Sequence, residues 1–164
     1  MDYTIRTILY ATDLGPHGAE VFNHAFSLAK QYGAKIHVVH ALEPMSDYAQ
    51  SLVETMVPPD ALKTLHQEGF EQVNREMHRR LEKFCADHLH PEAHTVVTEM
   101  RAVEGQPAQV ILDEAKRVGA DLIVLGSHGQ TTLGEIFMGS VAHKVLMKAR
   151  SPKIPVFLVP IERE

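Results

Sequence analysis

Short apolar runs rich in β-branched residues alternate along the chain with longer segments whose apolar positions recur every three or four residues. A short continuous apolar run is typical of a buried strand, and the longer spacing is typical of an amphipathic helix. Strands that alternate with helices in this way favour an α/β fold built from βαβ units on a parallel sheet. The pattern predicts five strands: Arg6–Ala11, Lys35–Leu42, His94–Ala102, Asp121–Gly126 and Pro155–Pro160.

Four helices are predicted between these strands. The first ends at Gly33, the second runs from about Pro59 to His88, the third runs from Pro107 to Gly119, and the fourth carries Ala142, Val145, Leu146 and Ala149. Residues from about 43 to 59 contain three prolines and little clear period, so we expect a long connection, for which a lid over a ligand is one interpretation. No repeat or shift in composition divides the chain, which predicts one domain over residues 1–164.

Composition and charge narrow the function classes. The chain has 45% hydrophobic and 23% charged residues, as ordinary globular proteins do, and its net charge of -5 disfavours a nucleic-acid-binding surface. A single cysteine, Cys85, excludes an intramolecular disulfide and fits a reducing compartment. The longest apolar runs are far shorter than the roughly 20 residues that span a bilayer, and no export signal is visible. We therefore expect a cytoplasmic protein without a membrane span.

The segment after the fourth predicted strand carries the clearest chemical signal. Gly126 and Gly129 are followed, after nine intervening residues, by Gly139 and Ser140 at the start of the last helix. In an open parallel sheet, ligands bind beyond the carboxyl ends of the strands. Glycines let the backbone approach a ligand closely, and the free N–H groups of a helix N-terminus attract phosphate. This segment is therefore a candidate phosphate-binding site.

Two common nucleotide motifs do not fit the chain. Glu135 and Ile136 stand where a P-loop needs Lys and Ser or Thr, although Gly129 and Gly134 have its glycine spacing. The segment after the first strand lacks the G-x-G-x-x-G of a dinucleotide fold. The chain is thus neither a P-loop protein nor a standard NAD-binding protein.

The pattern G-x2-G-x9-G-(S/T) resembles the ATP-binding branch of the universal stress protein family, and the resemblance extends over nearly the whole chain. Supporting segments are Ile8–Asp13, Ala120–Ser127 and Pro155–Val159. The resemblance implies a five-stranded parallel sheet in the order 3-2-1-4-5, with helices on both faces. It also implies an adenine nucleotide in the cleft and a homodimer joined along residues 155–160.

Carried over residue by residue, the family's nucleotide contacts fall at the ends of three strands and the start of the last helix. They are Ala11, Thr12, Asp13, Ala41, Gly126, His128, Gly129, Gly139, Ser140 and Val141. Asp13 would lie near the ribose, the phosphates or a bound Mg²⁺, whereas an acid before a helix is often only a cap. No catalytic residue is assigned.

The chain departs from many relatives in having no Lys or Arg between Gly126 and Gly139. The charge of a triphosphate would have to be met by helix-end N–H groups, by Mg²⁺, or by His128, His143 and Lys144. ADP or AMP could therefore be preferred over ATP.

Histidines and the last strand add two further hypotheses. His88, His90 and His94 lie close together in the sequence, but without a firm helical spacing we interpret them as surface residues rather than a metal site. The strand 155–160 is apolar on both faces, so we expect it to pair with a second copy, and coverage by its own helices is the alternative.

The leading functional hypothesis is a homodimeric stress-response regulator that binds ATP, ADP or AMP and signals to an unidentified protein partner. One alternative is a slow ATPase or phosphotransferase with Mg²⁺ held by Asp13, although no catalytic base is visible beside the expected phosphate site. Another is an interaction module that has lost the nucleotide.

Overall fold

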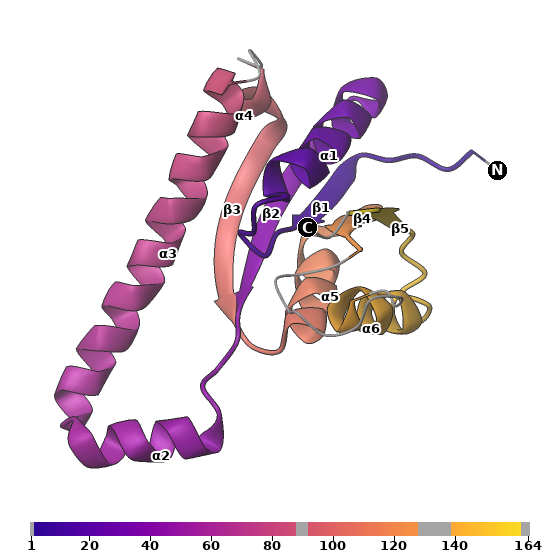
Figure 1. The fold of residues 1–164 in the computed structure, drawn as a ribbon. Coiled ribbons are helices and arrows are strands. Elements are labelled where there is room, and N and C mark those ends of the chain that lie inside the picture. Colours follow the sequence, from indigo (N-terminus) through magenta and orange to yellow (C-terminus); the bar gives the residue numbers. More distant parts are fainter. Residues whose placement is uncertain (1, 88–91, 128–138, 162–164) are drawn as a thin grey trace.

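Five parallel strands form one sheet in the order β3-β2-β1-β4-β5, which confirms the predicted fold class and strand order (Figure 1). The computed structural model describes residues 2–87, 92–127 and 139–161. The strands are β1 (Thr7–Ala11), β2 (Lys35–Leu42), β3 (Val97–Glu104), β4 (Leu122–Gly126) and β5 (Val156–Val159). Because β1 lies at the centre, its carboxyl end is flanked by those of β2 and β4.

Helices connect the strands. They are α1 (Gly18–Tyr32), α2 (Asp47–Met56), α3 (Pro59–Asp87), α4 (Ala93–Val96), α5 (Pro107–Val118) and α6 (Ser140–Lys148). Gly33 and Gly119 end α1 and α5 with φ of 67° and 64°, the left-handed conformation that favours glycine after a helix. The predicted ends of these two helices are confirmed.

The predicted start of the third strand was wrong. Residues 93–96 form the short helix α4 instead, and β3 begins at Val97. The backbone N–H and the hydroxyl of Thr95 both donate to the carbonyl of Glu92, at 2.9 and 2.6 Å, and Ala93 is fully buried. This helical turn directs the chain into the sheet. The apolar side chain of Val96 is compatible with a strand, so the sequence pattern did not reveal the turn.

The long connection expected over residues 43–59 contains a helix that was not predicted from the sequence, α2. Ser46 caps the helix by accepting a hydrogen bond from the N–H of Ala49 at 3.3 Å. Tyr48, Leu52 and Met56 are spaced four residues apart, so a helical signal was present in the sequence. It was obscured by the prolines on both sides.

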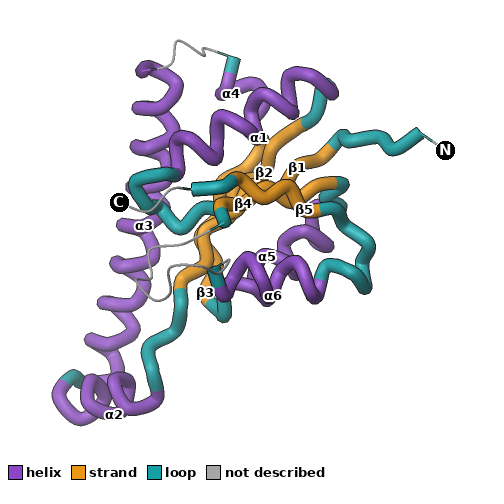
Figure 2. Tube along the Cα trace, turned by 45° about the vertical axis from the view of Figure 1, so that its right-hand side comes forward, coloured by secondary structure: helices purple, strands orange, loops and turns teal. Residues whose placement is uncertain are grey.

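Side chains at alternate positions of the strands pack into two separate hydrophobic cores, one on each face of the sheet. Ile8 and Tyr10 of β1 face α1, α3 and α4, whereas Leu9 faces α5 and α6. Figure 2 shows these two helical layers on opposite sides of the strands. Burying one of these aliphatic side chains completely stabilises the fold by roughly 1.5–3 kcal/mol. The two cores thus fix the strand ends, where the predicted site residues lie.

The helix α2 and the start of α3 project away from the sheet (Figures 1 and 2). None of the residues of α2 is buried. Within the described ranges, the protein has no helix with the length and apolar character needed to cross a membrane.

Candidate functional site

The carboxyl ends of β1, β2 and β4 bring most of the described predicted site residues to one edge of the sheet. Ala11 ends β1, Ala41 is the penultimate residue of β2, and Gly126 ends β4. The N–H of Thr12 donates to the carbonyl of Val39 at 2.9 Å, which extends the β1–β2 pairing beyond the end of β1. The sequence predicted this convergence, because strands 2, 1 and 4 are neighbours in the implied order.

Asp13 closes a tight turn after β1. Its Oδ1 accepts a hydrogen bond from the N–H of Gly15 at 2.8 Å, and the hydroxyl of Thr12 accepts one from the N–H of Leu14 at 3.1 Å. Leu14 has a φ of 60°, which these two hydrogen bonds help to hold. Asp13 therefore does not cap α1, whose N-cap residue is His17. The other carboxylate oxygen of Asp13, Oδ2, makes no hydrogen bond to a described residue and is exposed with its side chain.

Two polar side chains beneath this turn were not identified from the sequence. The hydroxyl of Tyr10 donates to the carbonyl of Gly18 at 2.9 Å, and burial raises the pKa of Tyr10 to about 12. The Nδ1 of His40 lies 2.8 Å from the carbonyl oxygen of Thr12. Because a carbonyl can only accept, His40 Nδ1 carries the hydrogen. A tyrosine in an apolar strand usually needs a partner for its hydroxyl, and this was the available signal.

Ser127 joins three segments after β4. Its N–H donates to the carbonyl of Val159 at 2.8 Å, and its carbonyl accepts from the N–H of Gly139 at 2.7 Å. Its hydroxyl accepts from the N–H of Ile161 at 3.0 Å. Ser127 thus ties the end of β4 to the last strand and to the start of α6.

A side chain at Gly126 would require the end of the Ile161 side chain to move. A Cβ atom built there would lie 2.3 Å from Cδ1 of Ile161 and 3.4 Å from Cγ2 of Val21. The absence of a side chain at this first glycine of the motif lets the C-terminal segment pack closely against β4. Gly126 therefore has a packing role in addition to the nucleotide role that the resemblance implies.

The start of α6 exposes backbone donors. Gly139 is its N-cap residue, and no side chain in the described part of the chain caps the helix. The first hydrogen bond inside the helix runs from the N–H of His143 to the carbonyl of Gly139 at 2.9 Å. The N–H groups of Ser140, Val141 and Ala142 therefore have no partner within the helix. The predicted contacts His128 and Gly129 lie outside the described residues.

The histidine cluster falls mostly outside the described part. His88 and His90 are not described, and His94 is exposed on α4. Among the residues that the structure does describe, no group of three His, Cys, Asp or Glu side chains could hold a metal ion. For an Mg²⁺ ion at this edge, the described residues offer the carboxylate of Asp13, which would act together with phosphate and water oxygens.

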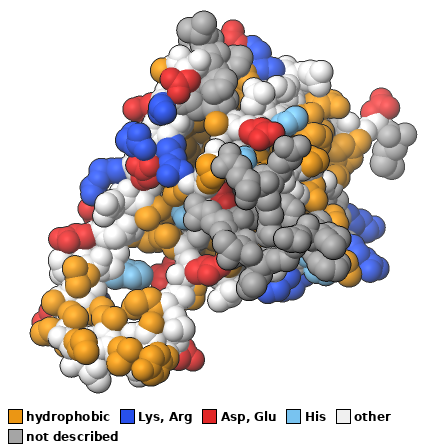
Figure 3. Space-filling view, in the orientation of Figure 1, with side chains coloured by type: hydrophobic (Ala, Val, Ile, Leu, Met, Phe, Trp, Pro, Cys, Tyr) orange, Lys and Arg blue, Asp and Glu red, His pale blue; other side chains and the backbone are white. Residues whose placement is uncertain are grey.

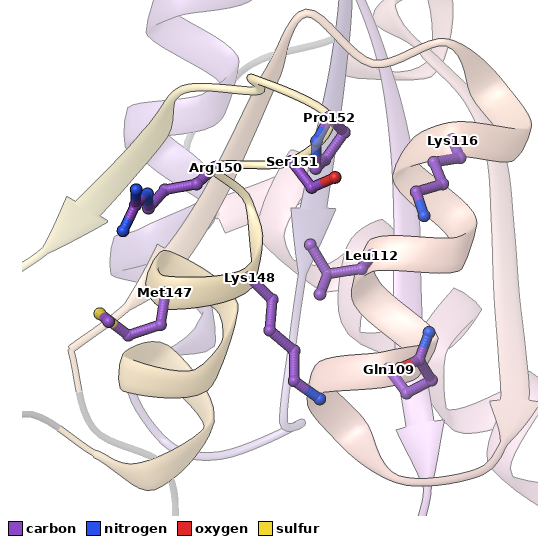
Figure 4. A pocket seen from close by; sticks show the side chains of 8 residues that line it. All are labelled: Gln109, Leu112, Lys116, Met147, Lys148, Arg150, Ser151 and Pro152. Carbon is purple, nitrogen blue, oxygen red and sulfur yellow. The ribbon is translucent and has the colours of Figure 1, made fainter.

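A pocket of about 400 Å³ lies between α5 and α6, away from the predicted site residues (Figure 4). It is lined by Gln109, Leu112, Lys116, Met147, Lys148, Arg150, Ser151 and Pro152. The last five of these belong to the C-terminal end of α6 and the turn after it, whereas Gly139 and Ser140 lie at the other end of the helix. The pocket and the glycine turn are therefore separate features.

The fold and the site define a doubly wound α/β protein with a glycine-bounded connection between the fourth strand and the last helix. The universal stress protein family model matches residues 4–160, and the chain belongs to this family. A universal stress protein of Thermus aquaticus is 33% identical over 153 residues, which cover 92% of this chain and 98% of that protein.

Solved structures of family members have the same fold. The structure of MJ0577 from Methanocaldococcus jannaschii superposes with a TM-score of 0.70 at 22% identity, covering 98% of this chain and 99% of that one. A universal stress protein solved in complex with cAMP has a TM-score of 0.62 at 25% identity, covering 95% and 97%.

Proposed function

We propose that this chain binds an adenine nucleotide at the carboxyl edge of the sheet and acts as a nucleotide-dependent regulator in the stress response. The observation that carries the proposal is the 2.7 Å hydrogen bond from the N–H of Gly139 to the carbonyl of Ser127. It brings both ends of the glycine-bounded connection together, and α6, whose start is capped by no described side chain, begins directly after Gly139. The cAMP complex of a family member supports an adenine nucleotide as the ligand class.

The phosphates would lie at the start of α6. The N–H groups of Ser140 and Val141 would donate to phosphate oxygens, because they have no partner in the helix and the helix dipole favours negative charge there. The exposed hydroxyl of Ser140 would add another donor. Gly139, which has no side chain, would leave the approach to these groups open.

The nucleoside would lie over the ends of β1 and β2. The backbone of Ala41 would contact the adenine, and Ala11 and Thr12 would line the floor of the site. Oδ2 of Asp13 is available for a ribose hydroxyl or for Mg²⁺, because only Oδ1 is engaged by Gly15. This fits Mg²⁺, which proteins commonly hold with one or two carboxylates in addition to substrate phosphates and water.

The number of phosphates is the least constrained part of the proposal. The connection from Gly126 to Gly139 contains no Lys or Arg, so the backbone N–H groups and Mg²⁺ would have to balance a triphosphate. Titrations with ATP, ADP, AMP and cAMP, each with and without Mg²⁺, would establish the preference. A gain in affinity with Mg²⁺ for ATP alone would support a metal-bound triphosphate.

A dimer through β5 is the second part of the proposal. The strand β5 lies at the edge of the sheet, and Phe157 on this strand is 37% exposed. An apolar edge strand is protected when it pairs with another strand, and a second copy supplies one. Sedimentation of the wild type and of Phe157→Asp would test this pairing, and a monomeric wild type would contradict it.

The nucleotide site is tested first by identifying any nucleotide that the purified protein releases on denaturation, using mass spectrometry. Calorimetric titration of Mg-ATP then compares the wild type with Gly139→Val and with Gly69→Val. Gly69 is the matched control, because a Cβ at this position on α3 meets no atom within 4 Å.

We expect the wild type and Gly69→Val to bind alike, and Gly139→Val to bind at least about tenfold more weakly because the new side chain crowds the phosphate site. Circular dichroism checks that each variant is folded. Absence of binding to any adenine nucleotide by a folded wild type would contradict the proposal.

A further inference from the structure

The segment 43–62, here called the acidic arm, carries a row of exposed apolar side chains. Met45, Tyr48, Leu52 and Met56 are 51%, 75%, 43% and 80% exposed. Their spacing of three, four and four residues places them along one side of α2 and the turn before it. They form a continuous apolar stripe, and Figure 3 shows hydrophobic side chains gathered over α2 at the lower left of the molecule.

Packing against the described residues does not account for this stripe. Ala49 and Val53, on the adjoining side of α2, are half-buried, whereas the stripe itself remains exposed beside the start of α3. The helix has ten residues, fewer than the roughly 12–15 below which isolated helices are marginal in water. It is held locally by the Ser46 cap and by the 2.9 Å hydrogen bond from Gln50 to Glu54. Exposed apolar stripes of this kind mark interaction surfaces.

The charge around the stripe indicates the kind of partner. Residues 36–62 contain no Lys or Arg, and the arm carries four carboxylates: Glu43, Asp47, Glu54 and Asp60. In Figure 3 acidic side chains border the hydrophobic patch over α2, and the basic side chains of this view lie elsewhere. A partner that covers the stripe must therefore bring positive charge to its rim.

The same charge argues against two other occupants. The arm of a second copy would bring four more carboxylates, and like charges across an interface are unfavourable. An anionic membrane surface would repel the arm in the same way. Two of the four stripe residues, Met45 and Met56, are methionines. Methionine side chains adapt to varied apolar surfaces, which favours a protein partner.

We propose that the acidic arm docks a positively charged amphipathic helix from another protein. The apolar face of that helix would cover Tyr48, Leu52 and Met56, and its Lys and Arg side chains would meet Asp47 and Glu54 at the rim. This inference stands on the arm alone and does not rest on nucleotide binding at the glycine turn.

The experiment measures binding of a fluorescent peptide by anisotropy, using the full chain without nucleotide. The probe is a peptide of about five helical turns made of Leu and Lys, with Leu in an i, i+3, i+4, i+7 pattern. Two further peptides serve as controls: one has Glu in place of Lys, and the other has the same residues in an order without helical period.

Three variants locate the binding. The stripe variant combines Tyr48→Ser, Leu52→Gln and Met56→Gln. The charge variant combines Asp47→Asn, Glu54→Gln and Asp60→Asn. The matched control is Leu146→Gln with Met147→Gln, which removes an exposed apolar pair, 45% and 54% exposed, from α6 instead.

We expect the Leu–Lys peptide to bind the wild type and the α6 control alike, and the stripe variant at least about tenfold more weakly. The charge variant should bind a few-fold more weakly at low salt and show a smaller salt dependence. Equal binding of the Glu peptide or the unordered peptide, or unchanged binding by the stripe variant, would overturn the proposal.

Two parallel measurements address the other occupants. Sedimentation of the wild type and the stripe variant reports self-association, and flotation with phosphatidylglycerol vesicles reports membrane binding. Loss of a wild-type oligomer in the stripe variant would overturn the proposal in favour of a second copy. Vesicle binding that depends on the stripe would overturn it in favour of a membrane.

Discussion

The connections that follow β2 and β4 leave the same edge of the sheet and are built in opposite ways. After β4, Ser127 bonds to Gly139 and to Ile161, so that the chain is tied back to the sheet. After β2, the chain extends into α2, none of whose residues is buried. Equivalent positions in one topology therefore serve two purposes: one connection positions backbone donors, and the other presents a surface.

The largest expected difference between the two regions comes from the same substitution made in each. Leu125, near the end of β4, is 4% exposed, and Leu52 on α2 is 43% exposed. Leu125→Ala should lower the free energy of unfolding by roughly 2–5 kcal/mol, because it leaves a cavity in the core. Leu52→Ala should change it by less than about 0.5 kcal/mol. Urea unfolding followed by circular dichroism measures both, and equal losses would show that the arm is packed in solution.

Gly126→Ala tests how closely the C-terminal segment packs on β4. The new methyl group would overlap Cδ1 of Ile161, whose side chain must move aside, so we expect a loss of about 1 kcal/mol in the free energy of unfolding. In an Ile161→Ala background the loss should be smaller by at least about 0.5 kcal/mol, because the overlapping atom is gone. Gly69→Ala, where the methyl group meets open space, should not destabilise the protein. Losses that simply add would contradict the contact.

Tyr10→Phe tests the support beneath the turn after β1. Loss of the hydrogen bond to Gly18 should lower the free energy of unfolding by about 1 kcal/mol at neutral pH. Tyr32→Phe, on a side chain that is 54% exposed, is the matched control and should have less than about half of that effect.

The same tyrosine predicts a pH dependence. Burial raises the pKa of Tyr10 to about 12, while in the unfolded chain it is about 10. The unfolded state therefore loses its proton first, so this contribution to stability is complete below about pH 10 and is lost as the pH rises toward about 12. The advantage of the wild type over Tyr10→Phe should shrink over this range and then reverse, because a shift of two pKa units corresponds to about 2.7 kcal/mol. A constant difference in urea unfolding across the range would contradict the role of burial.

The smallest expected effect on global stability comes from the cap of α2. Ser46→Ala should weaken the helix locally by about 1 kcal/mol but leave the free energy of global unfolding within about 0.5 kcal/mol, because α2 buries no residue. Hydrogen exchange of the α2 amides should accelerate. Ser127→Ala, the serine of the other connection, should lower global stability by about 1 kcal/mol instead, because its hydroxyl holds Ile161. If Ser46→Ala and Ser127→Ala lowered the free energy of global unfolding by similar amounts, the two connections would not differ in how tightly they are held to the sheet.

Much of the fold was predictable because local signals and the core agreed. The apolar run at Leu122–Leu125 is buried on both faces, and the glycines after α1 and α5 end those helices. The start of β3 was not predictable, because an apolar residue such as Val96 fits equally well at the start of a strand or at the end of a short helix. The site was predicted as a set of strand ends and glycines. Its supporting contacts from Tyr10, His40 and Ser127 were not, because each joins segments that are distant in the sequence or depends on a turn geometry.

The sequence by itself determined the alternation of strands and helices, the glycine spacing and the uneven distribution of charge. These are properties of periodicity, backbone freedom and composition, and they act locally. Only the tertiary structure decided that Ser127 forms hydrogen bonds with both Gly139 and Ile161. It also decided that only one carboxylate oxygen of Asp13 accepts a hydrogen bond from the described residues, and that the apolar stripe on α2 stays exposed. Each of these depends on which surfaces meet when the sheet assembles, and the same apolar spacing can end in a core or in solvent.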